Sequence, residues 1–310
     1  MVDGEISKSA PVTSGVPQGT VLGPLLFNLF INDMPGSVGE GSKIRLFADD
    51  CLVYREIKTP TDQHLLQKDL HNLEEWVTKW GMRFNAVKCQ IMHIARTKTV
   101  PRFYELCGQI LDTVDSAKYL GIVISNDLQW REQVCAASRK ASSTLHLIAR
   151  NLRCCPISTR ALAYKTLSRP QMEYSASVWD PYKREDINTL EKVNRRAARV
   201  VFRKSFRQQG VSPTSLLQRL GWDTLEKRRQ DQRLTMMYKI YHGLVAVPPT
   251  RLHKRTRQLR GHNLTFQVAT ATCDTTKFTF YCRTIPQWNA LPHTTAEAPT
   301  LNIFRSQLLA

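Results

Sequence analysis

The sequence is poor in acidic residues. Its 310 residues include 26 Asp and Glu against 44 Lys and Arg, which gives a formal net charge of +18 at pH 7. This excess of positive charge indicates a polyanionic partner, most simply a nucleic acid. The excess is concentrated, because residues 181–260 contain 20 Lys and Arg but 6 Asp and Glu. A basic surface that only aids solubility is the alternative, but clustering on this scale favours a nucleic-acid surface.

Long apolar runs and secretion signals are also missing. The longest apolar run, around residues 21–31, is interrupted by Gly23, Pro24 and Asn28 and is too short to span a bilayer. The first residues lack the basic and apolar pattern of a signal peptide. We therefore expect a protein that is neither secreted nor inserted in a membrane, and that resides in the nucleus, the cytoplasm or both.

The cysteines lack the spacing of a disulfide framework or a zinc finger. There are eight, with no C-x-x-C spacing, in a chain without a secretion signal. Zinc binding by Cys273, Cys282, His262 and His293 is the alternative to consider. Their spacing fits no common finger, so we expect scattered core or surface residues.

Strands and helices are mixed along the first 125 residues, and helices dominate afterwards. A hydrophobic content of 42% with 23% charged residues is typical of a globular chain. In the first part the patterns predict a helix over 25–31 with Pro24 at its start, a β-hairpin over 43–57, a helix from 59 to Gly81, and strands at 90–95, 103–106, 109–111 and 119–124. Beyond Asp127 they predict helices at 130–152, 158–175, 184–205 and 224–243, then partly strand-like residues from 276 and a short helix at 301–309. The sequence therefore predicts an α/β fold followed by a basic, mainly helical part.

Two adjacent carboxylates, Asp49 and Asp50, stand at the tip of the expected hairpin. Like charges side by side repel, and cation binding relieves the repulsion. Carboxylates at a rigid turn suit Mg²⁺, which takes one or two of them together with water and substrate phosphates. A solvated Asp-Asp turn is the alternative for an isolated pair. Two-metal phosphoryl transfer would require at least one more carboxylate from a neighbouring strand.

Further motifs surround this pair in a fixed order. SGVPQGTVLGPLLFNLFIND (14–33) precedes FADD (47–50), and WGMRFNAVKCQIM (80–92) and KYLGI (118–122) follow. This ordered set resembles the reverse transcriptase domain of non-LTR (LINE-type) retrotransposons of the jockey-like group, with FADD as the F/Y-x-D-D catalytic box. RALAYKTLSRPQMEYSASVWDPY (160–182), LEKVNRRAARVVF (190–202) and RTIPQWNALP (283–292) resemble the thumb and carboxy-terminal region of the same elements. The resemblance covers nearly the whole chain.

The resemblance implies a fold and an activity. The fold is a partial right-hand polymerase palm over 1–125, with a mixed sheet and helices, then a helical thumb-like region over 126–210 and a basic C-terminal region over 211–310. The activity is RNA-directed DNA polymerisation by two-metal nucleotidyl transfer. Its partners would be an RNA template, a DNA primer, deoxynucleoside triphosphates and Mg²⁺, with Mn²⁺ as the alternative ion.

The same resemblance implies roles for individual residues. Asp49 would bind the catalytic metal and Asp50 would assist it. Lys88 is the candidate general acid toward the leaving pyrophosphate, and a surface lysine without a specific role is the alternative. Contacts to the template-primer or the incoming nucleotide would be made by Gly15, Gln18, Gly19, Phe47, Ala48, Leu120 and Gly121.

The helix expected near residues 184–204 has two unlike faces. One face is apolar, and the other carries a row of cations without an acid among them, formed by Lys192, Arg195, Arg196, Arg199 and Arg203. A solvated charged face is the usual explanation for such a row. Five cations without an acid fit contact with nucleic-acid phosphates better.

One part of the family's catalytic apparatus has no counterpart in the sequence. In the family, the A motif, whose palm strand supplies the other essential metal-binding Asp, stands before the B motif, which residues 14–33 resemble. Here 13 residues precede Ser14, and the acids among them, Asp3 and Glu5, stand in no apolar strand pattern. We therefore expect an N-terminally truncated product without fingers, weak or inactive as a polymerase alone. The alternatives are a non-catalytic module that binds RNA or hybrid duplex, and a relic that folds poorly.

Overall fold

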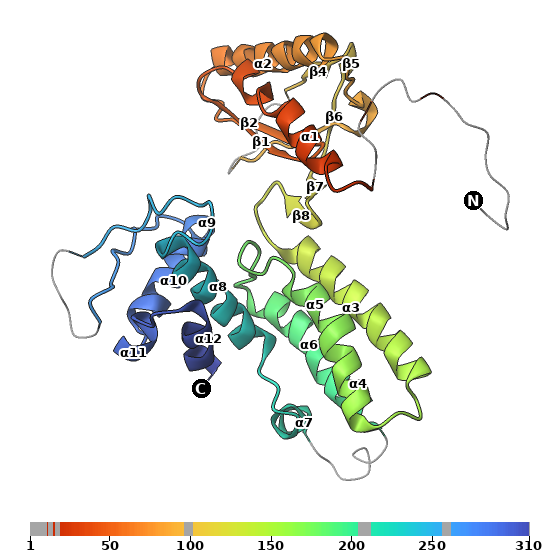
Figure 1. Ribbon diagram of the computed structural model, residues 1–310, viewed down its shortest axis with the longest axis vertical. Helices are drawn as coiled ribbons and strands as arrows, with labels where there is room; N and C mark the ends of the chain where they lie inside the picture. Colours follow the sequence, from red (N-terminus) through yellow and green to blue (C-terminus); the bar gives the residue numbers. More distant parts are fainter. Residues whose placement is uncertain are drawn as a thin grey trace. The chain divides into compact units, whose positions relative to one another are not determined.

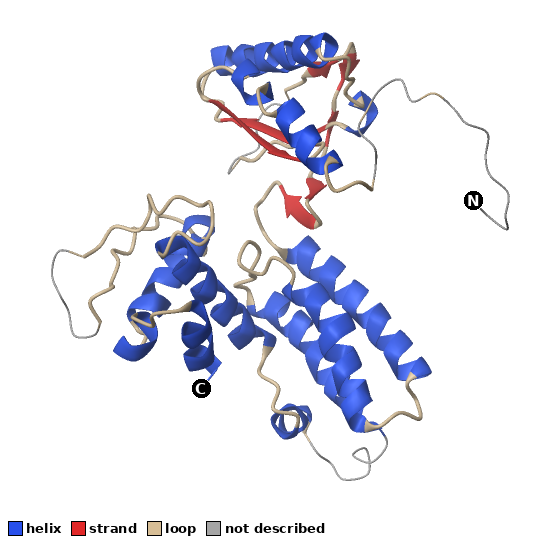
Figure 2. Ribbon diagram, viewed as in Figure 1, coloured by secondary structure: helices blue, strands red, loops and turns tan. Residues whose placement is uncertain are grey.

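The computed structural model describes residues 11 and 15 and residues 19–95, 102–203, 212–255 and 262–309. The chain forms two compact units (Figure 1). The first comprises residues 1–93 and 97–114, and the second comprises residues 94–96 and 115–310. The strands are short, and helices make up most of the second unit (Figure 2). This mixture of helix and strand agrees with the expected α/β class.

The first unit packs two helices with a β-hairpin. Helix α1 (Gly23–Ile31) has Pro24 in its first turn and is followed by the 3₁₀ turn η1 (Met34–Ser37). Helix α2 (Pro60–Lys79) begins at a capping box formed by Thr59 and Asp62, and it ends just before Gly81. Both helices lie where the sequence predicts them. The core between them and the hairpin is formed by Ile31, Met34, Ile44, Leu73, Trp76 and Val77.

The predicted hairpin is confirmed. Strand β1 (Ser42–Phe47) pairs antiparallel with β2 (Asp50–Arg55). At the open end of the hairpin, Asp69 of α2 accepts hydrogen bonds from the Gly39 N–H at 2.8 Å and from the Ser42 hydroxyl. Arg55 lies 3.9 Å from the same carboxylate. These polar contacts fix the base of the hairpin to α2, while its turn stays exposed.

The strands predicted after residue 90 are shorter than expected. In the described residues β3 (Gln90–Ile91) pairs parallel with β6 (Asp112–Thr113), and β4 (Glu105–Leu106) pairs antiparallel with β5 (Gln109–Ile110). The single strand predicted over 119–124 is wrong. It is a second hairpin, β7 (Ser116–Tyr119) and β8 (Ile122–Ser125), because Leu120 and Gly121 both have positive φ and turn the chain. All sheets in the described residues are two-stranded, so no extended palm-like sheet is seen among them.

The second unit is built on long helices. The predicted helices are confirmed as α3 (Arg131–Asn151), α6 (Arg184–Phe202) and α8 (Leu225–Tyr241). The helix predicted at 158–175 is present as α4 (Ile157–Ala163), a π turn η3 (Tyr164–Ser168) and α5 (Arg169–Glu173). A short helix, α7 (Pro213–Arg219), follows α6. One core, which includes Val134, Leu145, Tyr164, Trp179, Leu190 and Ala197, lies among α3, α5, α6 and α7.

The strand-like character predicted from residue 276 is wrong. The described residues form α9 (Asp274–Lys277), α10 (Phe280–Asn289), α11 (His293–Ala296) and α12 (Leu301–Leu309). Threonines and aromatic residues favour strand locally, but Ile285 and Trp288 fall on one face of α10 and are buried in a second core. Tertiary packing thus overrides local propensity here. The helix predicted at 301–309 is confirmed.

A buried ionic cluster joins these helices. Asp180 lies against Arg229 and Arg233 of α8 and Arg283 of α10, with Arg283 Nη1 at 3.0 Å from its carboxylate. Arg229 also donates to the carbonyl of Trp179 and lies 4.0 Å from the centre of its ring. Burial lowers the pKa of Arg229 and of Arg233 to about 9. Three cations therefore depend on one carboxylate inside the unit.

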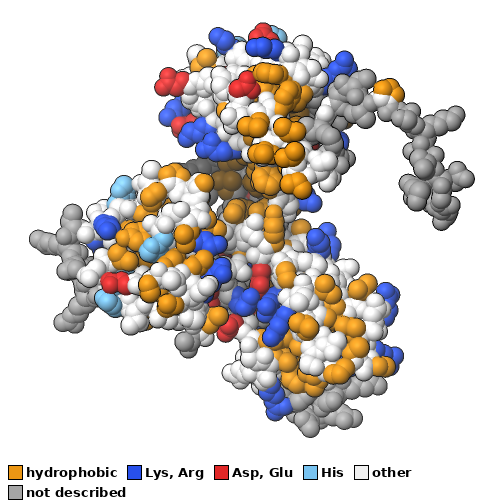
Figure 3. Space-filling view, viewed as in Figure 1, with side chains coloured by type: hydrophobic (Ala, Val, Ile, Leu, Met, Phe, Trp, Pro, Cys, Tyr) orange, Lys and Arg blue, Asp and Glu red, His pale blue; other side chains and the backbone are white. Residues whose placement is uncertain are grey.

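An apolar surface remains exposed on the first unit. Figure 3 shows hydrophobic side chains gathered over α1, where Leu25 is 57% and Leu29 is 66% exposed. The opposite side of α1 is buried through Gly23 and Ile31. Within the described ranges, no helix combines the length and the hydropathy needed to cross a membrane.

Candidate functional site

The Asp pair occupies the tip of the β1–β2 hairpin. Phe47 and Asp50 form the last cross-strand pair, so Ala48 and Asp49 are the two turn residues. Both carboxylates are exposed. Ala48 has a φ of 50°, and Asp49 is not among the residues with positive φ, which is the sign pattern of a type II′ turn. That turn prefers glycine at the position Ala48 occupies, so a strained backbone holds the two carboxylates at the tip.

The outer face of the hairpin adds groups that the sequence reasoning did not single out. Lys43 pairs with Tyr54 and Arg45 pairs with Leu52 across the strands, and all four side chains are exposed. They share the face that carries Asp50, since strand residues alternate between faces. On this face Arg45 and Leu52 form the next pair after Phe47 and Asp50, and Lys43 and Tyr54 follow farther from the carboxylate. The period-two alternation within KIRLF and DCLVY was the signal that indicated this face.

Lys88 lies at the end of the 3₁₀ turn η2 (Ala86–Lys88), and its side chain is exposed. Met82 and Phe84, which precede this turn, pack against the same core as Cys51 of β2. Burial, with a smaller contribution from Cys89, raises the pKa of the Cys51 thiol to about 11. The segment that leads into η2 thus shares a core with the strand that begins with Asp50, and both motifs lie in the first unit.

The glycine-rich motif is described only in part. Gly15 and Gly19 have φ values of 92° and 83°, a region that favours glycine. A Cβ on either residue would meet no atom within 4 Å. Backbone conformation, and not close packing within the described residues, explains glycine at these two positions. Gln18 lies outside the described residues.

Leu120 and Gly121 belong to the second unit. They form the turn of the β7–β8 hairpin, with φ values of 46° and 82°. The Tyr174 hydroxyl donates to the Leu120 carbonyl at 3.1 Å, and the Tyr174 ring lies 3.4 Å from where a Cβ on Gly121 would stand. This turn is therefore anchored on the helical unit, next to the end of α5.

The row of cations predicted on α6 lies on the surface of that helix. The opposite face is buried, with Ile187, Leu190 and Ala197 in the core. The row consists of the exposed Lys192, Arg196 and Arg199 and the partly buried Arg195 and Arg203. A stripe of this kind is suited to phosphate contacts along a nucleic-acid strand.

A second row of cations lies on the neighbouring helix α3. Arg196 donates to His146, and Arg203 donates to the carbonyl of Arg153. Because residue numbers rise together in these contacts, α3 and α6 run parallel. The exposed cations on this side are Arg139 and Arg150 of α3 and Arg153, which follows the end of the helix; His146, which accepts from Arg196, lies between Arg139 and Arg150. The spacing of seven and four residues along Arg139, His146 and Arg150 was the helical signal that sequence reasoning missed.

The Asp pair fits part of a magnesium site. Asp49 and Asp50 supply hard carboxylate oxygens, the donor type that Mg²⁺ shares with water and substrate phosphates. Within the described ranges, no group of three His, Cys, Asp or Glu side chains could enclose a metal ion. The pair therefore suits an ion shared with a substrate, and a two-ion cage requires a further carboxylate from outside the described residues.

His262 is not free to serve as a ligand in the alternative zinc site. His262 is buried, and its Nε2 donates to the Trp288 carbonyl at 3.0 Å. Its Nδ1 accepts the Leu264 N–H at 3.2 Å. Both ring nitrogens are therefore occupied by backbone groups.

Comparison with known families adds to this geometry. Residues 1–124 match the family model described as Reverse transcriptase (RNA-dependent DNA polymerase). These residues are therefore similar to reverse transcriptases. The matched segment contains the Asp hairpin, Lys88 and the Leu120–Gly121 turn, whereas the cation rows of α3 and α6 lie beyond it.

Curated relatives extend the similarity into the helical unit. The chain is 29% identical over 201 residues to the RNA-directed DNA polymerase from mobile element jockey of Drosophila melanogaster, covering 61% of the chain and 22% of that relative. It is 26% identical over 267 residues to the jockey polymerase of Drosophila funebris, covering 82% of the chain and 28% of the relative. A Nasonia vitripennis protein, the retrovirus-related Pol polyprotein from type-1 retrotransposable element R1 2, is 26% identical over 176 residues, 53% of the chain and 43% of the relative.

The chain thus spans less than a third of the length of the jockey polymerases it matches. No solved structure matches it.

Proposed function

We propose that the chain acts in RNA-directed DNA synthesis, as part of a retrotransposon reverse transcriptase. The substrates are an RNA template, a DNA primer and deoxynucleoside triphosphates. The observation that carries the proposal is the exposed Asp49–Asp50 pair on a strained hairpin turn, inside the segment that matches the reverse transcriptase family. The similarity to jockey polymerases supports the same activity.

The residues at the hairpin tip take the following roles. Asp49 and Asp50 would hold Mg²⁺, with Mn²⁺ as the alternative ion, and a carboxylate from outside the described residues would complete the cage. When bound, the ion stabilises the negative charge that develops on the triphosphate. Phe47 and Ala48 lie where the primer end would approach. Lys88 would donate a proton to the leaving pyrophosphate.

The second unit would hold the nucleic acid. The parallel rows of cations on α3 and α6 supply phosphate contacts, and these contacts position a duplex without reading its sequence. In this proposal residues 1–125 act as a palm, residues 126–210 as a thumb and residues 211–310 as a basic C-terminal region. Gly15, Gln18, Gly19, Leu120 and Gly121 would contact the template-primer or the incoming nucleotide.

Primer extension on an RNA template tests the proposal. The purified chain is assayed with Mg²⁺ and all four deoxynucleoside triphosphates, beside Asp49→Asn and the matched control Asp33→Asn, which removes an exposed carboxylate elsewhere in the first unit. We expect slow extension that Asp49→Asn lowers by at least about 100-fold, the usual order for lost charge stabilisation at a reacting centre. The control should extend like the unaltered chain.

Binding is measured on the same template-primer. Extension that survives Asp49→Asn would refute the role of the hairpin. Tight, salt-dependent binding without any extension would leave a nucleic-acid-binding module in place of a polymerase.

A further inference from the structure

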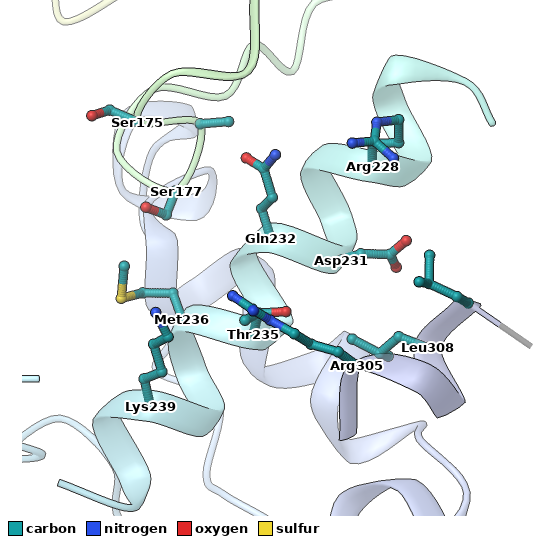
Figure 4. Close-up of a pocket in the computed structure, with 12 residues that line it drawn as sticks. Ser175, Ser177, Arg228, Asp231, Gln232, Thr235, Met236, Lys239, Arg305 and Leu308 are labelled. Atoms are coloured by element: carbon teal, nitrogen blue, oxygen red, sulfur yellow. The ribbon is translucent and has the colours of Figure 1, made fainter. Parts of the chain in front are cut away.

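A cleft of about 360 Å³ opens in the second unit. Its walls are the loop after α5, one side of α8 and the last turns of α12 (Figure 4). Figure 4 shows the Arg305 side chain reaching from α12 toward α8, and Gln232 and Lys239 on α8. The roles proposed above for the hairpin and for the two rows of cations do not involve this cleft.

Two cations in the cleft have no partner in the part of the chain that the structure describes. Lys239 is partly buried and Arg305 is exposed, and neither forms an ion pair or a hydrogen bond with a described residue. The other charged groups there are compensated. Arg228 binds the Glu173 carboxylate with two nitrogens, and Asp231 accepts from Lys227 Nζ at 2.8 Å. The uncompensated charge of the cleft is therefore positive.

Neutral hydrogen-bonding groups accompany these cations. The side chains of Ser175, Ser177, Gln232 and Thr235 line the cleft, and they form no hydrogen bond among the described residues. Ser175 has a φ of 51°, so the loop that presents the two serines is held in an unfavourable conformation. Donors and acceptors that share one concavity without bonding to each other are suited to a polar ligand.

Apolar side chains complete the walls of the cleft. Ala176, Met236 and Leu308 line it together with the exposed Leu309. The volume lies near the lower end of the roughly 300–1,000 Å³ of small-ligand sites. Cations, hydroxyls and apolar surface in this volume correspond to the phosphate, ribose and base of a single nucleotide unit.

We propose that this cleft binds one nucleotide of a single-stranded RNA, with its phosphate on Lys239 and Arg305 and its base against Met236 and Leu308. The hydroxyls of Ser175 and Ser177 and the Gln232 amide would bind the 2′-hydroxyl, which is the group that separates RNA from DNA. The site goes beyond the proposed polymerase function. It rests on that function only in taking RNA as the polyanion, and it needs no chemistry at Asp49.

Fluorescence anisotropy with a labelled ten-nucleotide RNA tests the site. The full chain is titrated at several salt concentrations, beside Lys239→Gln combined with Arg305→Gln. A matched control combines Lys68→Gln with Lys277→Gln, which removes two exposed cations elsewhere. Each neutralised phosphate contributes about 0.7 to the salt slope on a single strand. The cleft variant loses one phosphate contact, so it should lose about 0.7 of slope and about tenfold in affinity. The control should retain both.

Two further probes identify the ligand. The DNA of the same sequence should bind several-fold more weakly, and Gln232→Ala should remove that difference. RNA containing 4-thiouridine should cross-link to peptides that contain Met236 or Leu308.

Equal loss of affinity in the cleft variant and the control would overturn the proposal, as would cross-links confined to other segments. A free nucleotide that competes at micromolar concentration would show a mononucleotide site and not a strand site, which also overturns it. None of these readouts uses primer extension, so failure here is separate from failure of the polymerase function.

Discussion

At the scale of single residues, the hairpin turn combines strain with charge. Ala48 adopts a left-handed φ of 50° next to two exposed carboxylates. A left-handed conformation costs an L-residue roughly 1–2 kcal/mol. The β1–β2 ladder and the contacts of Asp69 at its base hold the turn in place against this cost.

Ala48→Gly should therefore stabilise the first unit by about 1 kcal/mol, because glycine adopts this φ without strain. Denaturant unfolding followed by a probe in the first unit measures the change. Ala86→Gly, in a turn without a positive φ, is the control and should destabilise. A loss of stability in Ala48→Gly would contradict the strained turn.

The sequence predicted the place of Asp49 and Asp50 but not this backbone strain. An apolar-polar alternation on both sides of FADD is enough to indicate a hairpin with the pair at its tip. Positive φ is readable from sequence only where glycine or asparagine marks it, and the turn here carries alanine.

At the scale of elements, α2 shows how local chemistry fixes a boundary. Thr59 and Asp62 form a capping box, and the Asp62 carboxylate accepts the Thr59 N–H at 2.8 Å and the Lys58 N–H at 3.1 Å. These bonds, with that of the Thr59 backbone the largest, lower the pKa of Asp62. The boundary was predictable because the box lies within four consecutive residues.

Thr59→Ala should destabilise the first unit by about 1 kcal/mol, since it removes the side-chain partner of the first turn. Thr61→Ala, an exposed neighbour inside the helix, should change stability little.

The contribution of Asp62 to the stability of the first unit depends on pH. It is present above the unfolded pKa of Asp62, about 3.9, and is lost as the pH falls through the lowered folded pKa. Unfolding curves between pH 2 and pH 7 should show this loss, and Asp62→Asn should abolish it. An unaltered pH profile in Asp62→Asn would contradict the assignment.

Other elements could not be read from local sequence. The segment around Phe280–Trp288 contains β-branched and aromatic residues and a proline, yet it is the helix α10 because Ile285 and Trp288 enter a core built by α8 and α12. That information lies in partners tens of residues away. Likewise, the cations on α3 can be assigned to one basic surface only because α3 lies beside α6.

At the scale of the whole molecule, the described residues form one core in the first unit and two in the second, and one buried carboxylate joins helices of the second unit. Asp180 compensates Arg229, Arg233 and Arg283, of which Arg229 is 2% and Arg233 is 3% exposed. Removing one partner of a buried ionic group leaves uncompensated charge.

Asp180→Asn should destabilise the second unit by about 3–5 kcal/mol, because three arginines would lose their counter-charge. Thermal unfolding should show two transitions, and this substitution should lower only one of them. Asp274→Asn, which removes an exposed carboxylate from the same unit, is the control. If the transition of the second unit kept its temperature in Asp180→Asn, the structural role of Asp180 would be refuted.

The central claim is that a divalent ion and the primer end meet at Asp49 and Asp50. Fe²⁺ in place of Mg²⁺, with ascorbate and peroxide, produces hydroxyl radicals that cut nucleic acid close to the bound ion. On an end-labelled RNA–DNA template-primer bound to the chain, we expect cuts concentrated at the primer 3′ end. Asp49→Asn combined with Asp50→Asn should abolish them while binding persists. Cuts spread evenly along the duplex, or cuts that survive in the double variant, would contradict the account.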